Sequence, residues 1–451
     1  MLRTHTCGEL NKSYASEKAT LCGWVETIRS AGKFSFLLLR DRYGTTQVFL
    51  NKNLTEKFAE LNKESVVKVS GDVKARPINQ INKEMVTGEI ELSAESLEVL
   101  NECDSLPLDS SNATEDTRLK RRYLDLRSKR MQYNLVTRHK VVNSVNGFMN
   151  SRGFLAVETP FLAKSTPEGA RDYLVPARNF PGKFFALPQS PQLFKQLLMI
   201  AGYDKYFQIV KCMRDEDLRS DRQPEFTQLD IEMSFIDEED VYELCESLMK
   251  KVFKEVLDVD IKIPFQRMSY AEAMKKYKTD KPNLSKRKDD YQFLWVVDIP
   301  MFEYSETEKR YIASHHPFTS PVEEDLHLLD KTPEKANARA YDLVLNGFEI
   351  AGGSIRNHRV DIQKKIFKAL KISDEEAEDK FGFLLNALSY GAPPHGGIAF
   401  GLDRLLAIMT AEESIRDVIA FPKNKEAKDL MLDAPSDVDK KQLDELGIKV
   451  K

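Results

Sequence analysis

Cysteine is scarce in this sequence and poorly spaced for disulfides or metal binding. The 451 residues include five cysteines, an odd number without C-x-x-C spacing: Cys7, Cys22, Cys103, Cys212 and Cys245. Such scattered thiols argue against a disulfide framework and a structural zinc site. Long apolar runs are also missing, and residues 1–10 have no apolar segment of the signal-peptide kind. We therefore expect a protein of the reducing cytoplasm with no membrane partner.

The sequence also lacks a large excess of positive or negative charge. The formal net charge is -4, and 41% hydrophobic with 31% charged residues is typical of a globular protein. A chain of this length is expected to form two or three domains. Because no overall basic field marks a nucleic-acid partner, any RNA contact must come from local patches such as Lys120-Arg121-Arg122 and residues 127–130. Short basic runs of this kind are more often solvated surface.

Residues 1–103 have the pattern of a small β-barrel. Apolar or β-branched residues alternate with polar ones in 20–28, 34–40, 45–50, 66–74 and 89–99, and a helical stretch, 54–62, separates the third run from the fourth. This order is typical of an OB-fold, which commonly binds single-stranded oligonucleotides, although an unrelated barrel has a similar pattern. Phe36 and Phe49, with Arg29 and Gln47, could form a platform for unpaired bases, or the rings could fill the core.

The rest of the chain predicts an α+β domain. Residues 104–130 are polar and are expected to form a hinge, and residues 131–451 alternate helices with apolar strands, which favours a mixed or antiparallel sheet. Pro160 cannot donate to a sheet, so the strand expected at Phe161-Leu162 is placed at an edge or an interface. Residues 412–451 are expected to be a C-terminal extension. The other expected strands are 206–211, 228–234, 293–298, 341–346 and 397–401, and the expected helices are 132–151, 191–201, 238–256, 376–390 and 402–409.

Side chains suited to phosphate chemistry are concentrated in residues 211–224. There is no Walker A loop, and Gly352-Gly353-Ser354 does not match the dinucleotide fingerprint, so any ATP must be held by side chains. Two expected strands flank the charged loop, which can offer arginines to phosphate and carboxylates to amines or magnesium. An exposed, ion-paired hairpin is the alternative interpretation. The pair His315-His316 has no third ligand at zinc-like spacing, and we assign no zinc.

Several stretches together resemble the class II aminoacyl-tRNA synthetases. Residues 207–235 resemble motif 2 of that class, 396–404 (GGIAFGLDR) resemble motif 3, and 153–162 resemble motif 1, which builds the dimer interface. Four further stretches are similar to ones typical of bacterial-type aspartyl-tRNA synthetases: 166–172 (TPEGARD), 189–195 (QSPQLFK), 315–319 (HHPFT) and 352–356 (GGSIR). The resemblance covers nearly the whole chain. It implies an N-terminal OB-fold β-barrel followed by a class II catalytic domain with an antiparallel sheet and flanking helices.

The resemblance implies an ATP-dependent aspartate–tRNA ligase. Such an enzyme activates L-aspartate to aspartyl-adenylate, releases pyrophosphate and transfers aspartate to the 3′-terminal adenosine of tRNA(Asp). By resemblance, Arg214 clamps the α-phosphate, Glu216 accepts from the adenine amine, and Arg404 covers the adenine opposite Phe226; Arg214, Glu216 and Arg404 are the catalytic set. The implied ATP-binding residues are Arg214, Glu216, Gln223, Phe226, Glu349 and Arg404, and Mg²⁺ would be held by Asp342 and Glu349.

The implied aspartate pocket is built for an anion. Arg356 and Lys195 would pair with the side-chain carboxylate, a planar group that suits a bidentate arginine. Asp230 would orient Lys195, and His315 would close over the same carboxylate. The α-ammonium would be taken by Glu168, Ser190 and Gln192, with Glu168 on a loop able to act as a lid.

The resemblance also implies tRNA contacts and a homodimer through the motif 1 region. The anticodon would be read by Arg29, Phe36, Gln47, Phe49 and Glu91, and the acceptor end would contact Arg222. A non-discriminating enzyme that also charges tRNA(Asn) stays open as the alternative. A non-catalytic tRNA-binding relative is disfavoured by the intact set Arg214, Glu216, Asp342, Glu349 and Arg404.

The sequence departs from the family pattern at two places. The large insertion usual in bacterial members is absent, and only residues 285–292 stand where it is expected. None of the site residues named above lies in that insertion, so we expect the chemistry to survive while tRNA affinity falls. Ala351 stands where a third glycine is usual, and we expect this change to be tolerated.

Overall fold

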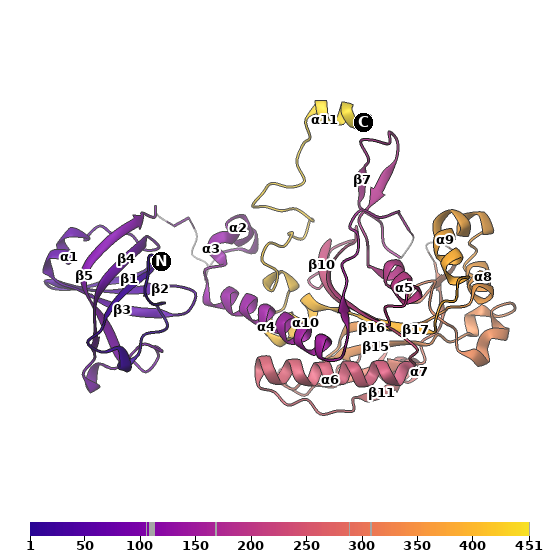
Figure 1. Cartoon of the computed structure of the whole chain (residues 1–451), viewed down its shortest axis with the longest axis horizontal. Coiled ribbons are helices and arrows are strands. Elements are labelled where there is room, and N and C mark those ends of the chain that lie inside the picture. Colours follow the sequence, from indigo (N-terminus) through magenta and orange to yellow (C-terminus); the bar gives the residue numbers. More distant parts are fainter. Residues whose placement is uncertain (105, 108–112, 167–168, 288, 307–308, 451) are drawn as a thin grey trace. The chain divides into compact units, whose positions relative to one another are not determined.

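The computed structural model describes residues 1–104, 106–107, 113–166, 169–287, 289–306 and 309–450 (Figure 1). The chain divides into two compact units, Met1–Ala113 and Thr114–Lys451. Each unit has its own buried hydrophobic core, which follows from the chain length. Among the described residues, no helix is both long and apolar enough to cross a membrane.

The first unit is a closed five-stranded barrel in the order β1-β2-β3-β5-β4. Every second side chain points inward, and Leu37, Val48 and Val69 are fully buried among them. The OB-fold prediction is confirmed in its strands and in the helix between the third and fourth, although that helix is shorter than expected. The elements are β1 (Lys18–Ala31), β2 (Phe34–Arg40), β3 (Thr45–Leu50), α1 (Lys52–Lys57), β4 (Val66–Ala75) and β5 (Ile90–Asn101), with 3-10 turns η1 (Lys12–Tyr14) and η2 (Ile78–Gln80).

The second unit is built on an eight-stranded sheet of order β11-β12-β15-β16-β17-β10-β9-β6. Neighbouring strands are antiparallel except at the two edges, where β11 pairs with β12 and β6 with β9 in parallel. The predicted mixed α+β sheet is therefore confirmed. The strands are β6 (Leu155–Ala156), β9 (Lys205–Met213), β10 (Glu225–Ser234), β11 (Gln266–Ser269), β12 (Phe293–Val297), β15 (Ala340–Leu345), β16 (Phe348–Arg356) and β17 (His395–Gly401).

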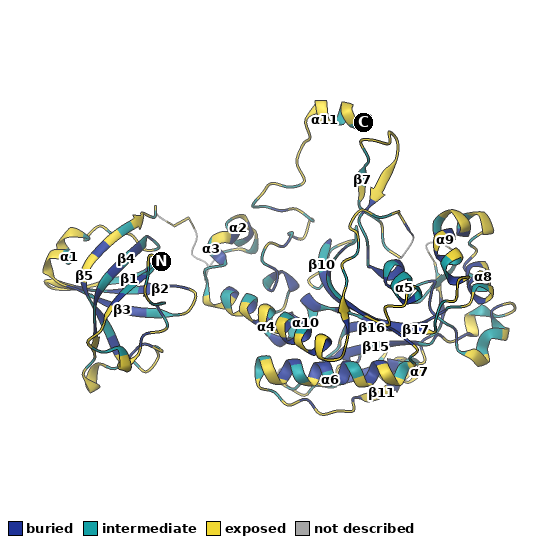
Figure 2. Cartoon of the chain, viewed as in Figure 1, coloured by how far each residue is buried: buried dark blue, intermediate teal, exposed yellow. Residues whose placement is uncertain are grey.

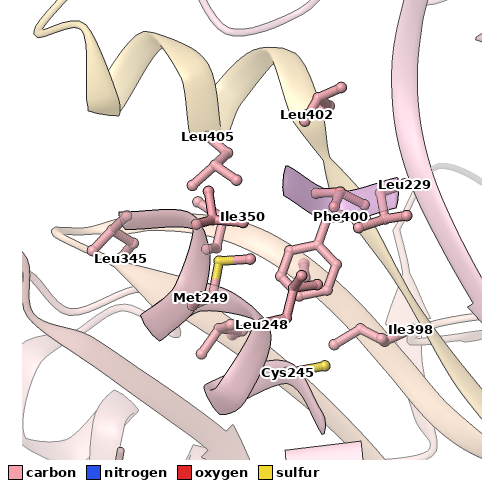
Figure 3. Close-up of a cluster of buried hydrophobic side chains, with 14 of the residues drawn as sticks. Leu229, Cys245, Leu248, Met249, Leu345, Ile350, Ile398, Phe400, Leu402 and Leu405 are labelled. Atoms are coloured by element: carbon pink, nitrogen blue, oxygen red, sulfur yellow. The ribbon is translucent and has the colours of Figure 1, made fainter. Parts of the chain in front are cut away.

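The main hydrophobic core lies between one face of this sheet and three helices, α4 (Lys129–Ser151), α6 (Glu238–Leu257) and α10 (Leu402–Met409). In Figure 3, Leu248 and Met249 of α6 lie against Phe400 and Ile350 of the sheet. Figure 2 shows the same division along α6, whose buried residues face the sheet while the other side is exposed. Asp237 and Asp240 form a capping box that begins α6 and satisfies its first backbone N–H groups.

Shorter elements complete the second unit. Two small hairpins, β7–β8 and β13–β14, stand outside the main sheet, and several shorter helices and 3-10 turns connect the strands. They are α2 (Glu115–Lys120), α3 (Arg122–Asp125), β7 (Leu174–Pro176), β8 (Phe184–Ala186), α5 (Gln192–Ile200), α7 (Tyr270–Tyr277), β13 (Phe302–Ser305), β14 (Arg310–Ala313), η3 (Glu323–Leu328), η4 (Pro333–Lys335), α8 (Val360–Ala369), α9 (Asp374–Leu388), η5 (Ile415–Asp417) and α11 (Lys440–Leu446).

The strand predicted at Phe161-Leu162 is wrong. The sheet edge is β6, and the chain after Pro160 bends until Ala163 makes an isolated bridge with Ala186. Pro160 lacks a donor N–H, and both Phe161 and Leu162 are exposed, so these residues have neither the pairing nor the burial that a strand needs.

The basic run at Lys120-Arg121-Arg122 does not serve as one RNA-binding patch. Arg122 is 2% exposed, and its guanidinium donates to the backbone carbonyls of Arg416, Ile419 and Ala420 at 2.8–2.9 Å. A fourth bond, of 2.6 Å, joins Arg122 to the buried carboxylate of Asp125. Residues 114–130, expected as a hinge, thus carry helices that hold the segment after α10 against the core.

We predict that Arg122→Ala lowers the free energy of unfolding of the second unit by about 3–5 kcal/mol, because it leaves three backbone carbonyls without this donor and, among the described residues, leaves Asp125 with only Arg118, at 3.7 Å, as a counter-charge. Urea unfolding in a Trp24→Phe background isolates the fluorescence of Trp295, the other tryptophan of the chain. Lys120→Ala, an exposed position of α2, is the matched control and should change stability by less than about 0.5 kcal/mol. Equal stabilities of the two variants would contradict this role of Arg122.

Candidate functional site

A cavity of about 830 Å³ lies over the central strands of the second unit. Alternation along β10 decides which side chains reach it. Leu229 and Ile231 point into the main core, whereas Phe226, Gln228 and Asp230 line the cavity. The same strand therefore supplies both the hydrophobic support and the polar floor.

Small residues on β17 leave room for a ligand between the larger side chains of β10 and β16. Gly397, Ala399 and Gly401 alternate with the buried Ile398 and Phe400. A Cβ at Gly397 would lie 2.1 Å from Oε2 of Glu232. Glycine is therefore required at residue 397, because the carboxylate from the neighbouring strand occupies that space.

One extra residue in β16 sets which of its side chains face the cavity. The β15–β16 register pairs Leu343 with Ala351 but Val344 with Glu349, so Ile350 is inserted as a β-bulge. The bulge changes the alternation and brings Glu349 to the face that carries Gly352 and Arg356. Ala351, the departure from the family pattern, packs in the main core.

Two cations and two carboxylates are buried together at the cavity floor. Lys195, Asp230, Glu232 and Arg356 each have side chains that are at most 2% exposed. The ammonium of Lys195 lies 2.5 Å from Asp230 and 3.3 Å from Glu232. Arg356 donates from Nε and Nη2 to the two oxygens of Glu232, at 2.9 and 3.0 Å. The predicted pairing of Lys195 with Asp230 is present, while Glu232 was not among the predicted site residues.

The two carboxylates respond oppositely to this environment. Burial raises the pKa of Asp230 even though Lys195 opposes the shift. Burial acts to raise the pKa of Glu232 too, but Arg356 and Lys195 outweigh it, and the pKa is lowered. Glu232 is thus held as the fixed counter-charge of Arg356, whereas Asp230 is the carboxylate that is more easily neutralised.

Only one edge of the Arg356 guanidinium is committed to Glu232. Its Nη1 contacts Ser354 Oγ and His316 Nε2, both at 2.7 Å. Burial lowers the pKa of His315 to about 4 and that of His316 well below its ordinary value, so both rings are neutral at pH 7. An anion that meets the Nη1–Nη2 end of Arg356 in the cavity would therefore take the place of one of these two Nη1 contacts. His316, which sequence reasoning left without a role, lies beside that end.

A second pair of carboxylates lines the cavity beside the first group. Burial, and then the charge of Glu349, raise the pKa of Asp342 well above its usual value. Burial works to raise the pKa of Glu349 as well, but Lys281 at 2.8 Å outweighs it and the pKa is lowered. His315 lies 3.4 Å from Asp342, whose Oδ1 is buried without a hydrogen-bond partner among the described residues.

This carboxylate pair fits a cation that completes its coordination with ligand oxygens. Within the described ranges, no cluster of three or more histidine, cysteine or acidic side chains could hold a metal alone. Magnesium commonly binds one or two carboxylates together with phosphate oxygens and water. The unpartnered oxygen of Asp342 is an available ligand, and a Cβ at Gly352 would lie 2.8 Å from it.

The loop between β9 and β10 brings arginines over the cavity. The guanidinium of Arg214 lies 5.1 Å from the ring centre of Phe226. Arg404, from the start of α10, donates to the carbonyl of Glu349 and lies 3.2 Å from Asp221. Among the described residues, the buried Nε atoms of Arg214 and Arg404 have no partner. Buried polar groups in folded proteins are normally hydrogen-bonded, and an anionic ligand in the cavity could accept from these two Nε–H groups.

Other predicted residues of the loop also line the cavity. Arg222 and Glu216 both line the cavity and form an ion pair with each other, at 3.0 Å. The amide of Gln223 exchanges hydrogen bonds with the backbone of Lys423, at 2.8 and 3.1 Å. Gln223 therefore also fastens the loop to the chain beyond α10.

The predicted ammonium site is partly described. Ser190 and Gln192 line the cavity, with Gln192 bonded to Gln196 at 3.1 Å. Gln189 exchanges two hydrogen bonds with the backbone of Ala170, at 2.8 and 2.9 Å, and so fixes the chain beside the predicted lid. Glu168 lies outside the described residues.

The five predicted anticodon residues share the outer face of the barrel in the first unit. Phe36 pairs with exposed Arg29 on β1 and with Phe49 on β3, and the two phenyl rings lie 5.8 Å apart. Gln47 donates to Glu91 at 3.0 Å. Both rings are half-buried, which leaves part of each available for stacking.

Two family models match this chain. The model described as tRNA synthetases class II (D, K and N) matches residues 114–425, and the OB-fold nucleic acid binding domain matches residues 19–100. A similar solved structure is asparaginyl-tRNA synthetase from Pyrococcus horikoshii with asparaginyl-adenylate, at a TM-score of 0.77 and 23% identity over 94% of this chain and 98% of that one. This likeness shows the fold.

Curated relatives match over the full length. Aspartate–tRNA(Asp/Asn) ligase of Caldanaerobacter subterraneus is 44% identical over 99% of this chain and 98% of its own, and that of Thermotoga maritima is 43% identical over 100% of both. Aspartate–tRNA ligase of Ruminiclostridium cellulolyticum is 42% identical over 99% and 98%.

The alignment with the Caldanaerobacter protein is longer than this chain. It spans 581 positions against 451 residues here, so at least 130 positions inside the aligned range have no counterpart. With this internal stretch missing, both matched domains are still present, and the chain belongs to the aspartate–tRNA ligase family of class II tRNA synthetases.

Proposed function

We propose that this chain activates L-aspartate with ATP and transfers it from aspartyl-adenylate to the 3′-terminal adenosine of tRNA(Asp). One observation carries the choice of amino acid: the guanidinium end of Arg356, with Lys195 behind it, is a fixed cation at the bottom of the cavity. The family membership supports the reaction type.

Aspartate recognition rests on the geometry of Arg356. Because Glu232 holds the Nε edge, the guanidinium cannot rotate, and its Nη1–Nη2 end is preorganised for a planar carboxylate. Asparagine would keep one carbonyl acceptor but place its NH₂ donor against the other guanidinium N–H, which would be left unpaired. A buried polar site that loses its partner rejects such an analogue strongly. Ser190 and Gln192 are proposed to meet the α-ammonium together with Glu168.

The chemistry needs positioning and charge stabilisation more than proton transfer. The attacking α-carboxylate of aspartate is already ionised, so no general base is required in the first step. Arg214 is proposed to stabilise the charge that develops on the α-phosphate, and its unpartnered Nε agrees with that role. Phe226 and Arg404 are proposed to flank the adenine, with Glu216 on its amine and Gln223 supporting the loop.

Magnesium is proposed to bind Asp342 and Glu349. When bound, it would neutralise the phosphate charge as pyrophosphate leaves. The two carboxylates reach the same face through the bulge at Ile350, and mutual repulsion between them is what a divalent cation would relieve.

The tRNA partner is proposed to contact both units. On the barrel, Phe36 and Phe49 would stack on anticodon bases, with Arg29, Gln47 and Glu91 at their edges. Arg222 is the proposed contact of the acceptor end. Charging of tRNA(Asn) is the alternative, because several relatives are named for both tRNAs.

A homodimer in the cytoplasm is proposed as the working form. Large exposed apolar side chains gather after α4, in the motif 1 region and the β7–β8 hairpin, as an interface requires: Leu155, Phe161, Leu162, Leu174, Phe180, Phe184 and Phe185. We also propose that residues 285–292 stand where the longer family members carry the segment that this chain lacks.

The test is aspartate-dependent exchange of pyrophosphate into ATP, followed by charging of purified tRNA(Asp) and tRNA(Asn). Exchange with aspartate, and none with asparagine or lysine, is the expected result. The tRNA(Asn) reaction then separates the two specificities. Absence of exchange with every amino acid would overturn the proposed activity.

We predict that Arg356→Lys lowers kcat/KM for aspartate in the exchange reaction at least a hundredfold, about 3 kcal/mol, while KM for ATP changes little. Lysine keeps the charge but cannot bond Glu232 and a ligand carboxylate together. Arg359→Lys, an exposed position three residues on, is the control and should match the parent enzyme. Unchanged aspartate kinetics in Arg356→Lys would move the anion site elsewhere.

We predict that Phe36→Ala lowers kcat/KM for tRNA(Asp) by about tenfold to a hundredfold and leaves aspartate-dependent exchange intact. Stacking of a base on an aromatic ring contributes about 1–3 kcal/mol. Tyr43→Ala, an exposed aromatic in the β2–β3 turn, serves as the control. Loss of exchange in Phe36→Ala, or charging equal to that of the control, would contradict the anticodon role.

A further inference from the structure

Lys281 lies in the catalytic cavity but has no role in the reaction described so far. Its Nζ is 2.8 Å from Oε2 of Glu349, and its side chain is 40% exposed. The partner is one of the two carboxylates proposed to bind magnesium. In this structure, therefore, a protein cation occupies the place next to Glu349 that a metal ion would take.

The fold holds the segment around Lys281 in place. Its backbone N–H donates to Thr279 Oγ1 at 3.2 Å, the following Pro282 is buried, and Leu284 packs against a buried cluster that includes Leu294 and Val344. Anchored on both sides, the lysine stem can move only its far end. Its position over the carboxylates is thus fixed by the chain, while its ammonium can exchange partners.

Charge balance decides where that ammonium goes when ATP and magnesium enter. A divalent cation held by Asp342 and Glu349 would remove the attraction that holds Lys281 and would add repulsion at short range. The nearest new anions would be the phosphates that share the metal. A lysine is well suited to this exchange, because it is a compact point charge on a flexible stem with three donors.

We propose that Lys281 is a further phosphate-binding cation of this active site. It neutralises Glu349 before Mg·ATP binds and contacts the departing pyrophosphate portion afterwards. This inference rests on the proposed function, and it adds a cation for the leaving group to Arg214, which is proposed to act at the α-phosphate.

The experiment measures binding of Mn²⁺ alone, by electron paramagnetic resonance, and of a magnesium-bound non-hydrolysable ATP analogue, by equilibrium dialysis. Lys281→Met is expected to bind Mn²⁺ alone about threefold to fivefold more tightly, because a competing cation is gone. The same variant is expected to bind the ATP analogue about tenfold to a hundredfold more weakly, because a charge-assisted hydrogen bond to phosphate is lost. Lys281→Arg should restore most of the analogue affinity.

Lys286→Met removes the same charge from an exposed position of the same connector and is the matched control. Analogue affinity that is equal within twofold in Lys281→Met and Lys286→Met overturns the proposal, whatever the Mn²⁺ result. Aspartate-dependent exchange is measured on the parent enzyme in parallel. Its absence there would be a failure of the proposed function, whereas its presence with an unaffected Lys281→Met variant would be a failure of this inference alone.

Discussion

The bidentate ion pair between Arg356 and Glu232 is the interaction on which the catalytic site depends. It joins β16 to β10 across the intervening β17, and both side chains are almost fully buried. Removing charges from water costs several kcal/mol per ion, and this cost is offset only by close, well-aligned partners. The pair therefore fixes the distance between the two strands, and it needs the glycine at residue 397 to pass over β17.

A second set of contacts ties the phosphate side of the cavity to the helices. Asp403, at the start of α10, accepts from the backbone of Thr227 at 2.7 Å and from Arg138 of α4 at 2.5 Å. Arg138 also donates to the carbonyl of Val418. Because these groups are mostly buried, the β10 strand, α10 and α4 are held together as one rigid frame. Arg404 follows Asp403 directly in α10, so this frame also positions Arg404 over the cavity.

Much of this architecture could be predicted from local pattern. The limits of β2, β3 and α10 follow the sequence analysis to the residue, because alternation and helical spacing are strong there. β16 was not predicted, since Ala351-Gly352-Gly353 has little strand propensity and only pairing with β15 and β17 makes it extended.

Which side chains come together in the cavity depends on contacts between distant parts of the chain, and the local sequence pattern does not contain these contacts. Glu349 shares the cavity face with Arg356 only because Ile350 is inserted as a bulge. Arg122 looked like part of a surface patch, but carbonyls almost 300 residues further along the chain take up its donors. Lys281 and His316 were passed over for the same reason, since their partners lie on distant strands. Resemblance to a family supplied the residues that line the cavity, while the structure supplied their partners.

The most direct test of this account is a crystal structure of the chain with a non-hydrolysable aspartyl-adenylate analogue. The account predicts that the Nη1–Nη2 end of Arg356 lies about 3 Å from both oxygens of the ligand side-chain carboxylate. Glu232 should remain on the Nε edge of the same guanidinium. A ligand carboxylate bound elsewhere in the cavity, with Arg356 Nη1 still contacting only Ser354 and His316, would contradict it.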